Sequence, residues 1–96
     1  MKLVNQDLLS AYDLRLQEMQ NALKGQDGKW VNILQVWRDE LSGISDQSAL
    51  RVHAARTARS MGGIESLGEV VQTGNDSNER RALEELYAVC RLIQSS

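Results

Sequence analysis

The sequence predicts an all-α protein, a small bundle of four main helices. Two observations favour this class: apolar residues recur at spacings of three and four, and no stretch alternates as a strand does. Because the chain has no proline, Gly, Ser, Asn and Asp must set the ends of the helices. With 96 residues, the chain 1–96 fits a single α-helical domain. The expected helices cover about residues 5–23, 29–41, 46–60 and 78–93, with a short helix near 66–72.

The segment from Lys29 to Leu41 holds both tryptophans of a chain that has no phenylalanine. On a helix its apolar residues share an arc of about 100°, the usual width of a core-facing stripe. Each buried indole removes on the order of 200 Å² from water, so the stripe needs a groove of matching size. The stripe consists of Trp30, Ile33, Leu34, Trp37 and Leu41.

The connection at 42–45 is short, so we expect the tryptophan helix and the helix that follows it to be antiparallel neighbours. Ala54 and Ala58 lie one turn apart in the following helix and leave a shallow strip on its inner side. Because close packing matches large side chains with small ones, we expect Trp30 or Trp37 to lie against this strip.

The first and last helices should pack together. The first carries an apolar stripe lasting about two heptads, which is too short to require a coiled coil. The last has a broad apolar face, an arc of about 160° that favours contact with two neighbours at once. Leu14 lies opposite the first stripe, either exposed or covered by a partner. That stripe consists of Leu9, Tyr12, Leu16, Met19 and Leu23.

The composition and net charge of the chain argue against several classes of protein. A formal net charge of −2 argues against general nucleic-acid binding. Asn5, Gln6 and Asp7 precede any apolar run, and no stretch approaches the ~20 apolar residues of a membrane span. We therefore expect a cytoplasmic protein that does not bind membranes. One cysteine and one histidine give no internal disulfide and no metal cluster, so we expect no metal and no cofactor.

No catalytic group stands out, and we expect no enzyme. Cys90 falls on the apolar face of the last helix, where a buried, inert thiol is the favoured interpretation. His53 lies at the edge of its helix's stripe, and we expect it to be partly exposed and not a catalytic base. The sequence fixes no carboxylate beside it, although Asp39 and Glu40 could approach it across the turn.

The only basic run lies on helix 46–60 and consists of Arg51, Arg56 and Arg59. Because a short glycine-containing turn precedes this helix, it could serve as a DNA-recognition helix. The negative net charge argues against that function. A solvated arginine face or a surface for an acidic partner is the favoured alternative.

The segment from Met61 to Val71 resembles a family of small, uncharacterised bacterial proteins. Members have a tryptophan near the start of a middle helix, a helix ending in Gly-Gly and a following Ser-Leu, and a tyrosine in the last helix. The matching residues here are Trp30, Gly62-Gly63-Ile64, Ser66-Leu67 and Leu86-Tyr87.

The chain departs from the family pattern at the glycine junction. Glu65 replaces a preferred glycine, and Gly68-Glu69 replaces Asn-Asp. The resemblance covers roughly residues 28–93. It implies a compact α-helical domain and, by analogy, a role as an immunity protein.

Small size, mild acidity and the lack of catalytic motifs favour a non-enzymatic protein-binding module. We expect an immunity-type inhibitor that occludes a cognate bacterial toxin, with a few side chains supplying most of the affinity. The alternative is a small structural or regulatory protein, a homodimer through helix 5–23 or a DNA-binding protein through the Arg51–Arg59 helix. For each acidic candidate a solvated surface charge is the competing interpretation. The candidate contacts are Asp39, Glu40, Glu65, Glu69, Leu14 and Val52.

Overall fold

The computed structural model describes residues 3–24, 28–61 and 77–96, and these residues form an all-α arrangement. Each of the four main helices begins and ends within one residue of its expected position. The short helix expected near 66–72 lies outside the described residues. The observed helices are α1 (Gln6–Leu23), α2 (Gly28–Leu41), α3 (Gln47–Ser60) and α5 (Ser77–Gln94).

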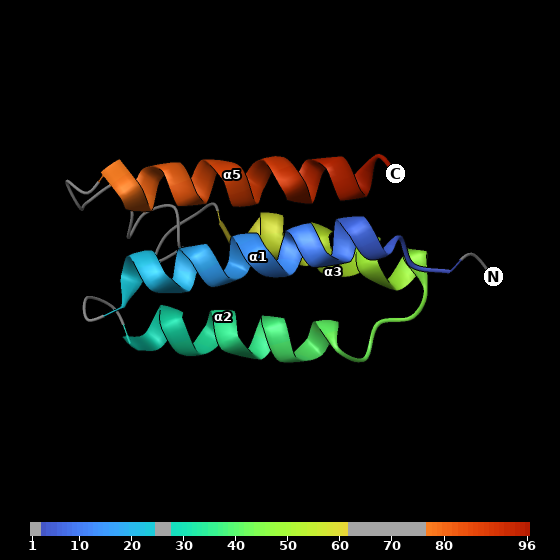
Figure 1. The fold of residues 1–96 in the computed structure, drawn as a ribbon, viewed down its shortest axis with the longest axis horizontal. Coiled ribbons are helices and arrows are strands. Elements are labelled where there is room, and N and C mark those ends of the chain that lie inside the picture. The colour runs from blue at the N-terminus through green and yellow to red at the C-terminus, as the bar shows by residue number, and fades with distance from the viewer. Residues whose placement is uncertain (1–2, 25–27, 62–76) are drawn as a thin grey trace.

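Helix α1 is central to the bundle. It runs between α2 and α5, and α3 packs against α5 (Figure 1). The expected packing of the first helix on the last is therefore confirmed. The apolar stripe of α1 is buried as its spacing predicts, and only Leu9 is left at its edge, half-buried. The fully buried residues of this stripe are Tyr12, Leu16, Met19 and Leu23.

The starts of α1 and α3 are tied together. The side chain of Asn5 caps α1 by accepting hydrogen bonds from two backbone N–H groups, and Asp46 caps α3 by accepting from the N–H of Ser48. The backbone N–H of Val4 donates to the Ser45 carbonyl at 3.1 Å. This pairing holds the segment before α1 against the connection that leads into α3.

Helix α3 runs back antiparallel to α2 as expected (Figure 1), but the expected packing of α2 on α3 is wrong. The pairs that pack along their lengths are α1 with α2, α1 with α5 and α3 with α5. A short connection fixes only the distance between two helix ends, and α3 leaves that point toward α5. The predicted contact of Trp30 or Trp37 with Ala54 and Ala58 assumed that α2 packs on α3. The observed packing of the helices does not support this contact. Ala58 instead shares a surface hollow with residues of α5.

The tryptophan helix packs on α1 and buries its stripe as expected. Trp30, Leu34 and Leu41 are buried, and Trp37 is half-buried. The two indole rings meet edge to face, with centroids 6.1 Å apart, a geometry that aromatic pairs favour. Within the described part of the chain, no helix combines the length and the apolar character that a bilayer crossing requires.

Candidate functional site

His53, on α3, is buried where this helix meets α1 and the end of α2. Its exposed fraction is 6%, so the prediction of a partly exposed histidine is wrong. The Nε2 atom lies 3.1 Å from Oε1 of Glu40, at the end of α2. The Nδ1 atom lies 2.7 Å from the hydroxyl of Tyr12, on α1. The structure thus brings Glu40 to His53, which spacing in the sequence left open.

The hydrogen bonds continue from Tyr12 to Thr57, whose hydroxyl oxygens are 2.5 Å apart. One tautomer of His53 satisfies all four side chains. Its Nε2–H donates to Glu40, and its Nδ1 accepts from the Tyr12 hydroxyl. The Tyr12 oxygen accepts in turn from the hydroxyl of Thr57. Tyr12 and Thr57 are almost fully buried, so water cannot replace these partners. The four side chains therefore form a connected network of hydrogen bonds that holds Glu40 at its outer end.

Burial keeps the interior of this network uncharged. It raises the pKa of Tyr12 well above the ordinary value, with Cys90 nearby adding to the effect. It also lowers the pKa of His53, which the hydrogen bond and charge of Glu40 raise only in part. Cys90 is fully buried as predicted, and burial raises the pKa of its thiol to about 12. No reactive thiolate or phenolate is therefore present at neutral pH.

Tyr12 and Thr57 are not among the candidates expected from the sequence, although the sequence pattern marks both. Each places a hydroxyl within a stripe of otherwise apolar residues, and a buried hydroxyl needs a hydrogen-bond partner. His53 and Thr57 are four residues apart on α3 and therefore share one side of that helix. The pattern predicts that polar side chains of α3 need hydrogen-bond partners in the interior, but it does not identify the partner residue on α1.

A hollow of about 400 Å³ opens on the outer side of this network, and we call it the Glu40 hollow. Its wall is partly apolar, with Val52 exposed over 60% of its surface. Glu40 and Val52, both candidates from the sequence, thus lie at one site. The lining residues are Glu40, Ile44, Asp46, Ser48, Ala49, Val52, His53 and Arg56.

The other candidates do not join this site. Asp39 is exposed on α2 and accepts a hydrogen bond from the side-chain amide of Gln35 at 2.9 Å. Leu14 is exposed over 47% of its surface, on α1. Glu65 and Glu69 lie outside the described residues.

The arginines of α3 are all exposed, as the sequence predicts. Arg51 reaches the carbonyl oxygen of Ser96 and the hydroxyl of Ser48, both at 3.4 Å. Arg56 and Arg59 form no ion pair with any described residue. Arg56 also lines the Glu40 hollow, which therefore carries a guanidinium group that pairs with no carboxylate of the described residues.

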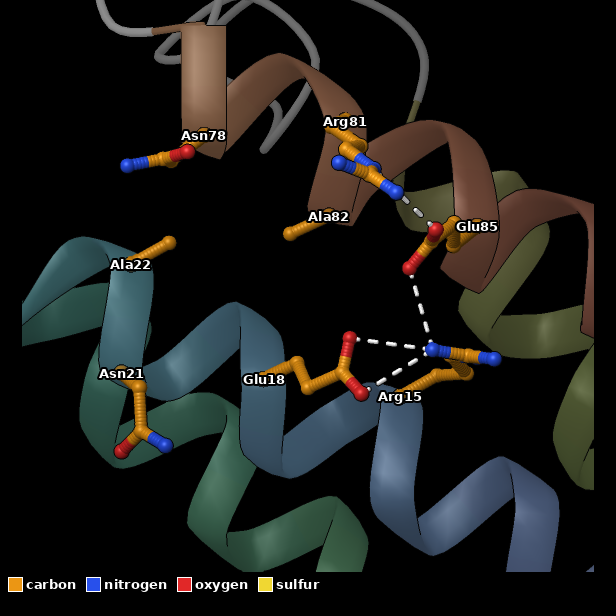
Figure 2. A pocket seen from close by; sticks show the side chains of 8 residues that line it. All are labelled: Arg15, Glu18, Asn21, Ala22, Asn78, Arg81, Ala82 and Glu85. Carbon is orange, nitrogen blue, oxygen red and sulfur yellow. Dashed lines mark hydrogen bonds and ion pairs between the residues drawn. The ribbon is translucent and has the colours of Figure 1, made fainter.

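A second hollow, of about 540 Å³, lies between α1 and α5 (Figure 2). Figure 2 shows the guanidinium group of Arg15 between the carboxylates of Glu18 and Glu85, at 2.9 and 3.0 Å. Arg81 approaches the other oxygen of Glu85 at 3.4 Å. Two arginines and two glutamates satisfy one another here, so this hollow presents no unpaired charge to a ligand.

Within residues 3–24, 28–61 and 77–96, no group of three or more histidine, cysteine or acidic side chains is placed to hold a metal ion. No family model matches the chain, and searches of curated proteins and of solved structures gave no match. The resemblance to small bacterial immunity-type proteins therefore stays a prediction, and the Glu40 hollow is the candidate binding site of the described residues.

Proposed function

We propose that this chain is a non-enzymatic protein-binding module that acts as an immunity-type inhibitor by covering a functional surface of a bacterial toxin. The observation that carries the proposal is that Glu40, fixed by its hydrogen bond to His53, shares a hollow with the exposed side chain of Val52. A fixed carboxylate beside an exposed apolar group suits a protein surface that offers a basic residue next to an apolar one.

Glu40 is well prepared to bind such a residue. Its Oε1 atom bonds to His53, while 38% of its side chain is exposed and Oε2 has no partner among the described residues. A lysine or arginine of the partner can donate a charge-assisted hydrogen bond to this oxygen. Because His53 already holds the carboxylate, binding costs less side-chain entropy than it would at a freely rotating glutamate.

Val52 supplies the apolar part of the contact. Together with Ile44 and Ala49 it forms a surface that a partner's side chain can cover. Burial of apolar area contributes about 25 cal/mol per Å². A single anchor residue in the hollow can therefore dominate the affinity, as a few residues do in most protein interfaces.

Site-specific photocrosslinking tests this proposal. A benzoylphenylalanine replaces Val52 in one variant and Leu92, exposed on α5, in the control. We expect the Val52 variant to capture one protein in the source cell, and the Leu92 variant not to capture it. The captured protein is then purified, and its toxicity is measured with and without co-expression of this chain.

Binding of the purified partner gives the decisive measurement. We expect E40K and V52D to weaken the dissociation constant at least ~10-fold, since each removes an anchor and introduces a mismatch. The control L92D should bind as the unchanged protein does. Equal binding by all four proteins, or a captured protein that is not toxic, would refute the proposal.

The two alternative functions have less support. A homodimer through α1 would have to use the side of Leu14, because the main stripe of α1 is buried within the chain. Arg56 and Arg59, which form no ion pair within the described part of the chain, favour an acidic ligand for α3. Sedimentation of the purified protein tests for the homodimer, and salt-dependent retention on DNA tests for DNA binding.

A further inference from the structure

The carboxylate of Glu40 belongs to two sites at once. On its inner side Oε1 lies 3.1 Å from Nε2 of His53. On its outer side Glu40 lines the hollow in which the proposed function places a basic residue of the partner. Two cations, one inside and one outside, would therefore meet at the same carboxylate.

We propose that His53 is a pH-dependent switch for the Glu40 hollow. With His53 neutral, Glu40 presents a full negative charge and holds the partner's basic residue. With His53 protonated, the imidazolium group neutralises Glu40 and the partner is released. The regulation rests on the proposed function, because it concerns the same site.

The groups around His53 leave Glu40 as the main source of negative charge. Tyr12 of α1 and Cys90 of α5 are neutral because burial raises the pKa of each. Arg56, on α3, adds a positive charge that disfavours protonation of His53. Asp46 also lines the hollow, where it caps α3. A partner's cation beside Glu40 acts in the same direction as Arg56.

The network can accept a proton without losing a hydrogen bond. Once Nδ1 of His53 carries hydrogen, it donates to the oxygen of Tyr12, and the Tyr12 hydroxyl turns to donate to Thr57. Protonation is therefore compatible with the folded state. Since burial lowers the pKa of His53 below its ordinary value of about 6.5, the switch acts below that pH and leaves the hollow acidic at neutral pH.

Protonation of His53 and binding of a cation at Glu40 must affect each other equally, by thermodynamic linkage. If protonation of His53 weakens the binding of a cation, that cation must lower the pKa of His53 by the corresponding amount. This relation can be tested without a partner by placing a cation in the hollow. His53 is the only histidine of the chain, so its ring protons give a single, unambiguous titration by NMR.

The test compares V52K with V52Q, which changes the same exposed position without adding charge. We expect V52K to lower the pKa of His53 by about 0.5 units or more relative to V52Q, as for unit charges near a protein surface. L92K adds the same charge on α5 and should leave the pKa unchanged. E40Q should lower the pKa of His53, and D39N should not.

A second measurement connects this coupling to binding. With the purified partner, the dissociation constant should rise at least ~5-fold between pH 7.5 and 5.5 for the unchanged protein, and less for H53Q. Equal pKa values in V52K and V52Q, or pH-independent binding, would overturn the switch. If E40K and V52D bind the partner normally, the proposed function fails, while the titration still reports whether Glu40 and His53 are coupled.

Discussion

The imidazole of His53 and the hydroxyl of Tyr12 lie 2.7 Å apart and join α3 to α1 within the core. Their rings meet edge to face, with centroids 5.4 Å apart. These two residues are 41 positions apart in the sequence, and the main packing partners of their helices lie elsewhere: α1 packs on α2 and α5, and α3 packs on α5. The contact therefore fixes α3 relative to α1 and, through Glu40, relative to the end of α2.

Removal of the Tyr12 hydroxyl should destabilise the protein. In Y12F, Nδ1 of His53 and the hydroxyl of Thr57 lose their common partner in the interior. We expect a loss of ~1–3 kcal/mol in the free energy of unfolding, measured by urea titration. The control Y87F removes a hydroxyl from an exposed ring on α5 and should change stability by less than ~0.5 kcal/mol. Equal effects of the two substitutions would contradict the network.

Stability should fall as the solution becomes mildly acidic. Because the pKa of His53 is lower in the folded protein than in the unfolded chain, the unfolded chain binds the proton more readily. The contribution of His53 to the free energy of unfolding is complete above the ordinary histidine pKa of about 6.5. It is lost as the pH falls from there toward the pKa of His53 in the folded protein. Urea midpoints between pH 7.5 and 5 measure it.

Two variants isolate this contribution from that of the carboxylates. H53Q should show a flatter dependence of stability on pH in this range. E40Q should show a steeper one, because loss of the carboxylate lowers the folded pKa of His53 further. A dependence that is the same in all three proteins would mean that His53 is not responsible.

The thiol of Cys90 should be inert in the native protein. It is fully buried, and burial raises its pKa to about 12, so very little thiolate exists at neutral pH. We expect labelling by a disulfide reagent to be at least ~100-fold slower in buffer than in denaturing urea. Rapid labelling in buffer would show that the interior near Tyr12 opens readily.

Enlargement of Ala54 should strain the core. Its side chain is fully buried on α3, which packs against α5. We expect A54L to lower the free energy of unfolding by ~1–3 kcal/mol through overpacking. The matched control A88L places the same side chain at an exposed position of α5 and should be nearly neutral. An unchanged melting temperature in A54L would mean that the core has room at this position.

The sequence determined the helices and their inward faces, because both depend on residues that are close in the chain. The stripe from Tyr12 to Leu23 is buried, as are Trp30, Leu34 and Leu41 of the tryptophan helix, and each helix ends within one residue of its predicted position. The burial of Cys90 followed from the same spacing.

The tertiary structure alone decided which helices meet. The link between α2 and α3 constrains the distance between two ends and not the angle between two axes, so α2 could pack on α1 while α3 packed on α5. The same choice brought Glu40 to His53 and Tyr12 to Thr57. Such contacts depend on how three helices are placed together, and no periodicity within a single helix carries that information.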